Sequence, residues 1–242
     1  MKKFALVCGA SGSIGRAICE ELAQDGWSLY VHYNSGLERI QEMALSLSQR
    51  FSAQEFIPVQ ADFAGANGAE VLANQLFSLQ AVIFANGHAY TQLLEDTPIE
   101  EMDKLWRVHV QNPMHLLAKV SRKLRANDTS YVLFIGSIWG TAGAAGEVVY
   151  SAVKGAQHAF VKAYAQEVAY NGIRVNAIAP GFIDTDMNNH LTEQEKQQIA
   201  SDIPLQRLGI VMDVAHMTRF YVSGAADYVT GQIVHVNGGW YI

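Results

Sequence analysis

Cysteine is scarce in this sequence: Cys8 and Cys19 are the only two in 242 residues, and no Cys-x-x-Cys pair occurs. Two cysteines cannot build a disulfide framework, and without paired thiolates a structural metal site is not expected. We therefore predict no bound metal and a location in the reducing cytoplasm.

Long apolar runs and an excess of positive charge are also missing. No stretch approaches the roughly 20 apolar residues that a transmembrane helix needs. The apolar run behind the N-terminal lysines covers only 4–8 before the glycines begin, which is too short for the core of a signal peptide. The net charge of −6 disfavours binding to nucleic acid or to anionic membranes, so we expect neither partner.

The sequence instead alternates short apolar segments with longer amphipathic ones. Its length of 242 residues suits one domain spanning 1–242. Strands that are apolar throughout and separated by helices predict a single-domain α/β fold, with a Rossmann-type, doubly wound parallel sheet of about seven strands and helices on both faces. The predicted strands cover 4–8, 28–33, 55–60, 81–85, 131–136, 173–180 and 232–237, and the predicted helices cover 13–26, 37–51, 99–126 and 150–170.

A glycine-rich turn, "CGASGSIG", follows the first predicted strand. Glycines there let the backbone approach a pyrophosphate, and the N-terminus of the next helix offers free N–H groups to its charge. The turn thus predicts a dinucleotide site, against the alternative of a plain strand–helix turn with Ser13 as N-cap. The cofactor-binding residues predicted here are Gly9, Ser11, Gly12, Ser13, Ile14 and Gly15.

The end of the second predicted strand indicates which dinucleotide binds. A carboxylate there would bind the adenosine ribose of NADH and repel the phosphate of NADPH. The strand ends in "VHYNSG", the first acid is Glu38, and Asn34 and Ser35 can donate to a phosphate. We predict NADPH, with NADH less favoured. Asp62, after the third strand, is predicted either to accept from the adenine amino group or to cap a helix.

Tyr150 and Lys154 are spaced one helical turn apart, and Ser137 lies just past the fifth predicted strand. In a ketone reduction, Tyr150 would give a proton to the carbonyl oxygen that Ser137 holds. A free tyrosine has a pKa of about 10, and a nearby lysine ammonium favours the phenolate, while burial opposes it. We expect the net result to be a group that can give or take a proton near pH 7. The alternative is an ordinary pair on a helix face and a strand-end serine.

These motifs, together with "IRVNAIAPGFIDTDM" and "YVTGQIVHVNGGW", resemble the short-chain dehydrogenase/reductase family over the whole chain. The resemblance implies NADPH, a homotetramer and the proton-transfer role of Tyr150, with Lys154 also holding the nicotinamide ribose. The family pattern usually has threonine and glycine where Cys8 and Ser13 stand. The further cofactor contacts that the resemblance implies are Asn86, Gly87, Tyr150, Lys154, Pro180, Gly181, Ile183 and Thr185.

His109 stands where the family carries a fourth catalytic residue, an asparagine that holds a water linking the lysine to solvent. A histidine can hold such a water or relay the proton itself, because its unperturbed pKa is near 6.5. The alternative is a histidine that only fills the space.

Two branches of the family fit the sequence, and they differ in substrate. The chain is similar to 3-oxoacyl-carrier-protein reductases, but Asp128 and Asn171 stand where those enzymes carry arginines that dock an acidic carrier. "SIWG" and "GEVVYS" with "KGAQH" resemble more closely a bacterial branch that includes the elongation factor P 5-aminopentanone reductase. We slightly favour this second branch. The substrate is then a small ketone, or a ketone attached to a carrier or another protein.

The segment between Ser137 and Tyr150 lines the substrate pocket in this family. Trp139 offers an apolar wall or belongs to the core, and Glu147 pairs with a substrate ammonium group or is a surface residue favoured by the helix dipole. A non-catalytic NAD(P)-binding sensor or scaffold is the alternative from another class. Such proteins usually lose the proton donor, whereas here the serine, tyrosine and lysine are all present.

Overall fold

The computed structural model describes residues 2–188 and 191–241 and contains one parallel sheet. Within these residues the sheet has seven strands in the order β3-β2-β1-β4-β5-β6-β7, which confirms the predicted fold class. The order reverses between β1 and β4, as in doubly wound folds. The strands are β1 (Phe4–Cys8), β2 (Ser28–Tyr33), β3 (Phe56–Gln60), β4 (Ala81–Phe84), β5 (Ser130–Ile135), β6 (Ile173–Pro180) and β7 (Ile233–Val236).

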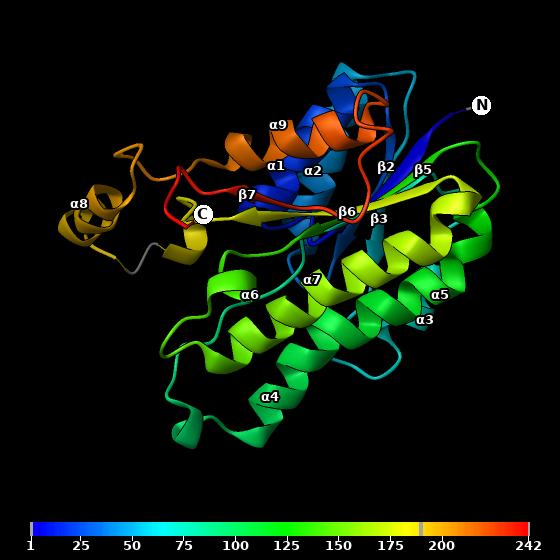
Figure 1. Cartoon of the computed structure of the whole chain (residues 1–242). Helices are drawn as coiled ribbons and strands as arrows, with labels where there is room; N and C mark the ends of the chain where they lie inside the picture. Colours follow the sequence, from blue (N-terminus) through cyan, green and yellow to red (C-terminus); the bar gives the residue numbers. More distant parts are fainter. Residues whose placement is uncertain (1, 189–190, 242) are drawn as a thin grey trace.

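Helices cover both faces of this sheet (Figure 1). One face carries α1 (Ser13–Gln24), α2 (Leu37–Arg50) and α9 (Val211–Val222), and the other carries α3 (Gly68–Ala73), α5 (Asn112–Leu124) and α7 (Val148–Val168). The remaining helical segments are η1 (Leu94–Asp96), α4 (Ile99–Trp106), η2 (Arg107–Gln111), α6 (Trp139–Ala142), η3 (Ala169–Asn171), η4 (Asp186–Asn188) and α8 (Glu193–Asp202). α8 projects beyond the end of the sheet (Figure 1).

The core has two halves, one on each side of the sheet. In β1, Ala5 and Val7 pack into one half while Leu6 and Cys8 pack into the other. Alternate side chains of a strand point to opposite faces, so a strand buried on both sides must be apolar throughout. This explains why the sequence pattern located the strands to within one residue at most ends.

The helix predicted over 99–126 is wrong as a single α-helix. The structure divides it into α4, a π-helical segment η2 and α5. Pro113 explains the break: in a continuous α-helix its missing N–H would leave the carbonyl of His109 without a donor, and its ring would clash with that carbonyl. A π-helical turn widens the helix at this point and places His109 within the widened segment.

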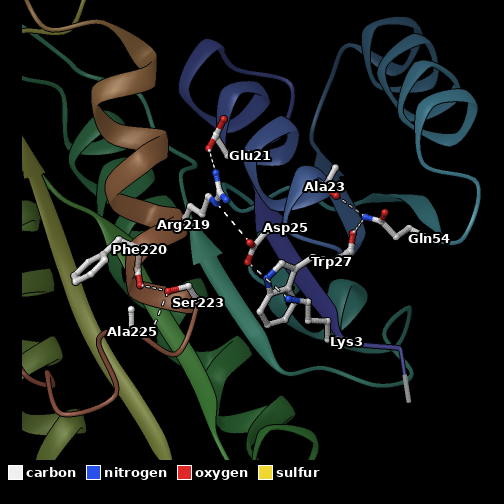
Figure 2. A network of polar contacts seen from close by, with 10 residues as sticks. All are labelled: Lys3, Glu21, Ala23, Asp25, Trp27, Gln54, Arg219, Phe220, Ser223 and Ala225. Carbon is white, nitrogen blue, oxygen red and sulfur yellow. Dashed lines mark hydrogen bonds and ion pairs between the residues drawn. The ribbon is translucent and has the colours of Figure 1, made fainter.

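A polar network ties α9 to α1 and so holds the helix that begins at the glycine-rich turn (Figure 2). Glu21 is buried, and Arg219 reaches its carboxylate at 3.3 Å and that of Asp25 at 3.5 Å. Lys3 lies 3.7 Å from Asp25 and stacks over the Trp27 ring at 4.7 Å. A buried carboxylate requires such a partner, because leaving it unpaired would strongly destabilise the fold.

Candidate active site

Two adjoining hollows lie at the carboxyl edge of the sheet, where the strand order reverses. The segment 85–88 after β4 lines both of them. One hollow continues toward the glycine-rich turn after β1, and the other continues toward the ends of β5 and β6. Ligands of open α/β sheets bind at this place, and the hollows together form one cleft.

The glycine-rich turn has the backbone that close approach to a ligand requires. Gly9 has a φ of +77°, and a Cβ there would lie 2.7 Å from the backbone of Asn86. A Cβ on Gly15 would strike the carbonyl of Gly9. Gly12 is the N-cap of α1, with no side-chain cap and no acid in the first turn. This leaves N–H groups and the positive end of the helix dipole available to an anion, so the turn fits a pyrophosphate.

Ser13 does not cap α1, so the alternative role predicted for it is wrong. It is the first helical residue, and its hydroxyl donates to the Asp186 carboxylate at 3.1 Å. The hydrogen bond connects the glycine-rich turn to the segment after β6. Ser11 and Gly12 line the first hollow, and Ile14 lines the second.

The first hollow also contains the residues predicted to bind the adenosine half of the cofactor. Asn34, Ser35 and Asp62 line it, and no acid is among the residues at the end of β2. One carboxylate oxygen of Asp62 accepts from the N–H of Ala64 at 2.8 Å. Asp62 therefore stabilises its own turn and also faces the hollow.

Ser137, Tyr150 and Lys154 line the second hollow together. Ser137 follows β5, and its side chain interacts with the Tyr150 hydroxyl. The Lys154 ammonium lies 5.5 Å from the centre of the Tyr150 ring and donates to the Ile135 carbonyl at 3.0 Å. The Ser137 oxygen also accepts from the N–H of Trp139 at 3.2 Å, which fixes its direction. Helix α7 and the end of β5 thus bring the three side chains together as the sequence predicts.

The pKa of Tyr150 differs from the value expected from the sequence. Burial, and after it the Glu147 carboxylate, raise the pKa of Tyr150, while its interaction with Ser137 lowers it. Tyr150 is therefore protonated at neutral pH, and the lysine does not bring it near neutrality. Burial lowers the pKa of Lys154 to about 7. The ammonium lies fully inside the protein, which disfavours its charged form.

His109 lies against Tyr150. The two rings are 5.6 Å apart in an edge-to-face arrangement, and the His109 ring nitrogen Nε2 is 3.0 Å from the carbonyl of His88. Because a carbonyl only accepts, Nε2 carries the hydrogen and Nδ1 keeps a free lone pair. Burial, then the charge of Lys154, lower the pKa of His109 well below its ordinary value. The lowered pKa favours the neutral imidazole, and the role of His109 in holding a water or relaying a proton stays a prediction.

Trp139 and Glu147 border the same hollow as Ser137, Tyr150 and Lys154. The Trp139 ring also packs on Trp240 and Tyr241, with ring centres 5.6 and 5.3 Å away, so it serves both the cleft and the C-terminal packing. Glu147 is the N-cap of α7 but makes no side-chain cap. It is half-buried, and burial raises its pKa. It therefore lies in the cleft and not on an open helix surface.

The remaining predicted cofactor contacts surround the second hollow. They are Asn86, Gly87, Pro180, Gly181, Ile183 and Thr185. The side-chain amide of Asn86 donates to the carbonyl of Val108 at 2.9 Å, and a Cβ on Gly87 would strike the His109 ring. The cleft also includes His88 and Phe182, which the sequence motifs do not single out. The position of His88 just after β4 is a signal that could have identified it.

A doubly wound sheet with a glycine-rich first turn and a Ser–Tyr–Lys constellation defines a nucleotide-dependent oxidoreductase. A family model described as "Enoyl-(Acyl carrier protein) reductase" matches residues 9–241. The chain belongs to the short-chain dehydrogenase/reductase family.

Relatives of this chain match it over all or nearly all of its length. It is 41% identical to "Uncharacterized oxidoreductase YmfI" of Bacillus subtilis (strain 168) over 242 residues, all of both chains. It is 33% identical to "3-oxoacyl-[acyl-carrier-protein] reductase FabG" of Escherichia coli (strain K12), with 99% of this chain and 98% of the relative covered. Among solved structures, a blue fluorescent protein from a metagenomic library in complex with NADPH superposes with a TM-score of 0.90 at 28% identity, covering 99% and 98% of the two chains.

The sequence predicts neither a metal site nor a membrane partner. Within residues 2–188 and 191–241, no group of three or more histidine, cysteine, aspartate or glutamate side chains is arranged to hold a metal ion. In the same part of the chain, no helix combines the length and the apolar character needed to cross a bilayer.

Proposed function

We propose that this protein is an NADPH-dependent ketone reductase in which Tyr150 gives the proton. The observation that supports this most is the convergence of Ser137, Tyr150 and Lys154 on one hollow, next to a glycine-rich turn that fits a pyrophosphate. When bound, the dinucleotide supplies a hydride from its nicotinamide ring. The protein has to hold the ketone in one orientation and deliver one proton to its oxygen.

The three side chains divide this work. Ser137 donates a hydrogen bond to the carbonyl oxygen and holds it beside the Tyr150 hydroxyl. The raised pKa keeps Tyr150 protonated at neutral pH, and the alkoxide that forms is a far stronger base than a phenolate, so the proton moves to it. In its charged form, the Lys154 ammonium stabilises the phenolate that remains.

The adenosine side of the cleft supports NADPH over NADH. Asn34 and Ser35 face it, and no carboxylate at the end of β2 would repel a phosphate. We expect kcat/KM with NADPH to exceed that with NADH by about tenfold or more, equivalent to about 1.4 kcal/mol of preferential binding. The measurement is steady-state oxidation of each cofactor with one ketone at fixed concentration. A preference for NADH would contradict the proposed cofactor.

Glu147 supports a ketone that carries a cationic amine. It places a half-buried carboxylate at the same hollow as the proton donor, and the apolar ring of Trp139 borders that hollow too. A carboxylate and an indole face together suit an ammonium group. A fatty-acyl chain gains nothing from this carboxylate. Among the two branches, we therefore favour the ketone on a modified lysine, as reduced by the elongation factor P 5-aminopentanone reductase, over a 3-oxoacyl carrier.

We expect the Glu147→Gln variant to lose its preference for a cationic ketone. The test uses a matched pair of methyl ketones, one ending in trimethylammonium and the other in the isosteric tert-butyl group. Wild-type kcat/KM should favour the cation by about tenfold, and Glu147→Gln should reduce that ratio to near one, because the electrostatic attraction between the carboxylate and the cation is removed. The control is Glu167→Gln on the same helix, an exposed residue outside the cleft.

Two other outcomes of that assay decide the substrate class. Equal rates for both ketones in the wild-type protein would contradict the amine-bearing substrate. Reduction of an acetoacetyl carrier protein that is faster than reduction of either methyl ketone would favour the 3-oxoacyl role instead, in line with the FabG relatives. NADPH oxidation with none of these ketones would contradict the reductase itself.

The proposal extends to assembly and location. Apolar side chains are exposed on α4, α5 and α7 at Ile99, Trp106, Met114 and Val148. Exposed apolar surface of this kind supports the homotetramer that the family resemblance implies. Both cysteines are free and buried, which suits the cytoplasm.

A further inference from the structure

A side-chain amide on α7 donates to a backbone carbonyl of the π-helical turn η2. The Gln157 side-chain nitrogen donates to the His109 backbone oxygen at 2.7 Å. We propose that Gln157 is a positioning residue of the reductase: it fixes the widened turn η2, so that the His109 ring stays packed against Tyr150. This inference rests on the proposed reductase function and gives a role to Gln157, to which the sequence analysis assigned none.

The backbone of η2 creates the need for this contact. In an α-helix, the His109 carbonyl would accept from the N–H of residue 113, but that residue is proline. His109 is almost wholly buried, so water does not readily replace the N–H that Pro113 lacks. A buried carbonyl without a donor destabilises a protein. The Gln157 amide satisfies it from a neighbouring helix.

The position of Gln157 on α7 links this contact to the reacting groups. It follows Tyr150 by two helical turns and Lys154 by about one, and residues at such spacing share one helix face. Gln157 is itself buried. A single helix face therefore presents the proton donor, the lysine and the amide that holds the facing turn. This hydrogen bond joins η2 to α7 next to the apolar contacts that Leu105 and Val110 make with Val153.

The His109 ring is restrained on its other sides as well. Its Nε2 is 3.0 Å from the carbonyl of His88, and Gly87 has no Cβ because one would strike the ring. The Tyr150 ring meets it edge to face at 5.6 Å. Because Gln157 holds the backbone, the imidazole ring keeps one position against the Tyr150 ring and so orients the Tyr150 hydroxyl. A shift of about 1 Å in such a position can lower a rate by about a hundredfold.

The test compares Gln157→Met, which keeps the length but removes the amide, with Gln166→Met on the same helix. Gln166 also donates to a backbone carbonyl, that of Lys162 at 3.2 Å, but on the exposed surface. With the trimethylammonium ketone as substrate, we expect kcat of Gln157→Met to fall by about tenfold or more, with KM for NADPH within about twofold of wild type. Gln166→Met should leave both unchanged.

Each substitution is repeated in a His109→Ala background, which separates positioning from stability. The His109 carbonyl is backbone and survives, so Gln157→Met should lower the melting temperature in both backgrounds. Its effect on kcat should vanish once the ring is gone. An unchanged kcat in the first background, or an equal loss in both, would overturn the inference while leaving the reductase in place. Gln157→Leu is the second variant if Gln157→Met does not fold. A wild-type protein that reduces no ketone would overturn the reductase and this inference together.

Discussion

Replacing Tyr150 with phenylalanine should lower kcat for ketone reduction by about a thousandfold or more while leaving NADPH binding nearly unchanged. The substitution removes only the hydroxyl, which interacts with Ser137 within the cleft. The ring that packs against His109 remains, so the fold of α7 is kept. The measurements are single-turnover NADPH oxidation and a fluorescence titration of NADPH binding.

Tyr164→Phe is the matched control. Tyr164 lies on the same helix, stacks on Phe160 with ring centres 5.2 Å apart, and lines neither hollow. Its kcat should equal that of the wild type. A Tyr150→Phe protein with full turnover would contradict the assigned proton donor. A protein that binds NADPH but turns over no ketone in either form would instead fit a nucleotide sensor or scaffold.

Replacing Lys154 with methionine should abolish most activity and stabilise the fold at the same time. The lysine is fully buried, and burial lowers its pKa from 10.5 to about 7. Between these two pH values the unfolded chain holds more protons than the folded one, so the stability of the wild type rises with pH across that window. Below about pH 7 the penalty of burying the ammonium is fully present, on the order of a few kcal/mol.

Methionine is close in length and carries no charge, so Lys154→Met escapes this penalty. We expect kcat to fall by about a hundredfold or more, because the phenolate loses its stabilising charge. We expect the melting temperature to rise most at or below pH 7, with the gain shrinking toward pH 10. Lys162→Met, an exposed residue of the same helix, should show no such trend. A constant difference between wild type and Lys154→Met at all pH values would contradict the buried-lysine account.

The parts of the fold that follow from local patterns could be predicted from the sequence. Strands buried on both faces are apolar throughout, and a helix such as α2 repeats its apolar side chains at Ile40, Met43, Ala44 and Leu47. The ends of these elements were located closely for that reason. The sequence analysis did not predict the π-helical turn, because the helix pattern of 99–126 continues on both sides of Pro113. The proline was the available signal for the break.

The candidate site was predictable as a set of motifs but not as a set of contacts. The spacing of Tyr150 and Lys154 and the position of Ser137 after a strand are readable, because each depends on one local element. The direction in which the Tyr150 pKa shifts cannot be predicted in this way, because it depends on burial, on the Glu147 carboxylate and on Ser137 together. The pairing of Gln157 with the His109 carbonyl joins residues 48 positions apart, and no sequence pattern contains it.

The most direct test of the central claim follows the hydrogen itself. The protein is incubated with NADPH that carries deuterium at both C4 positions of the nicotinamide ring and with the trimethylammonium ketone, and the product is examined by mass spectrometry. The account predicts an alcohol that carries one deuterium on the former carbonyl carbon, formed in step with NADPH oxidation. NADPH oxidation without deuterium in the alcohol, or bound NADPH with no alcohol from any ketone tested, would contradict it.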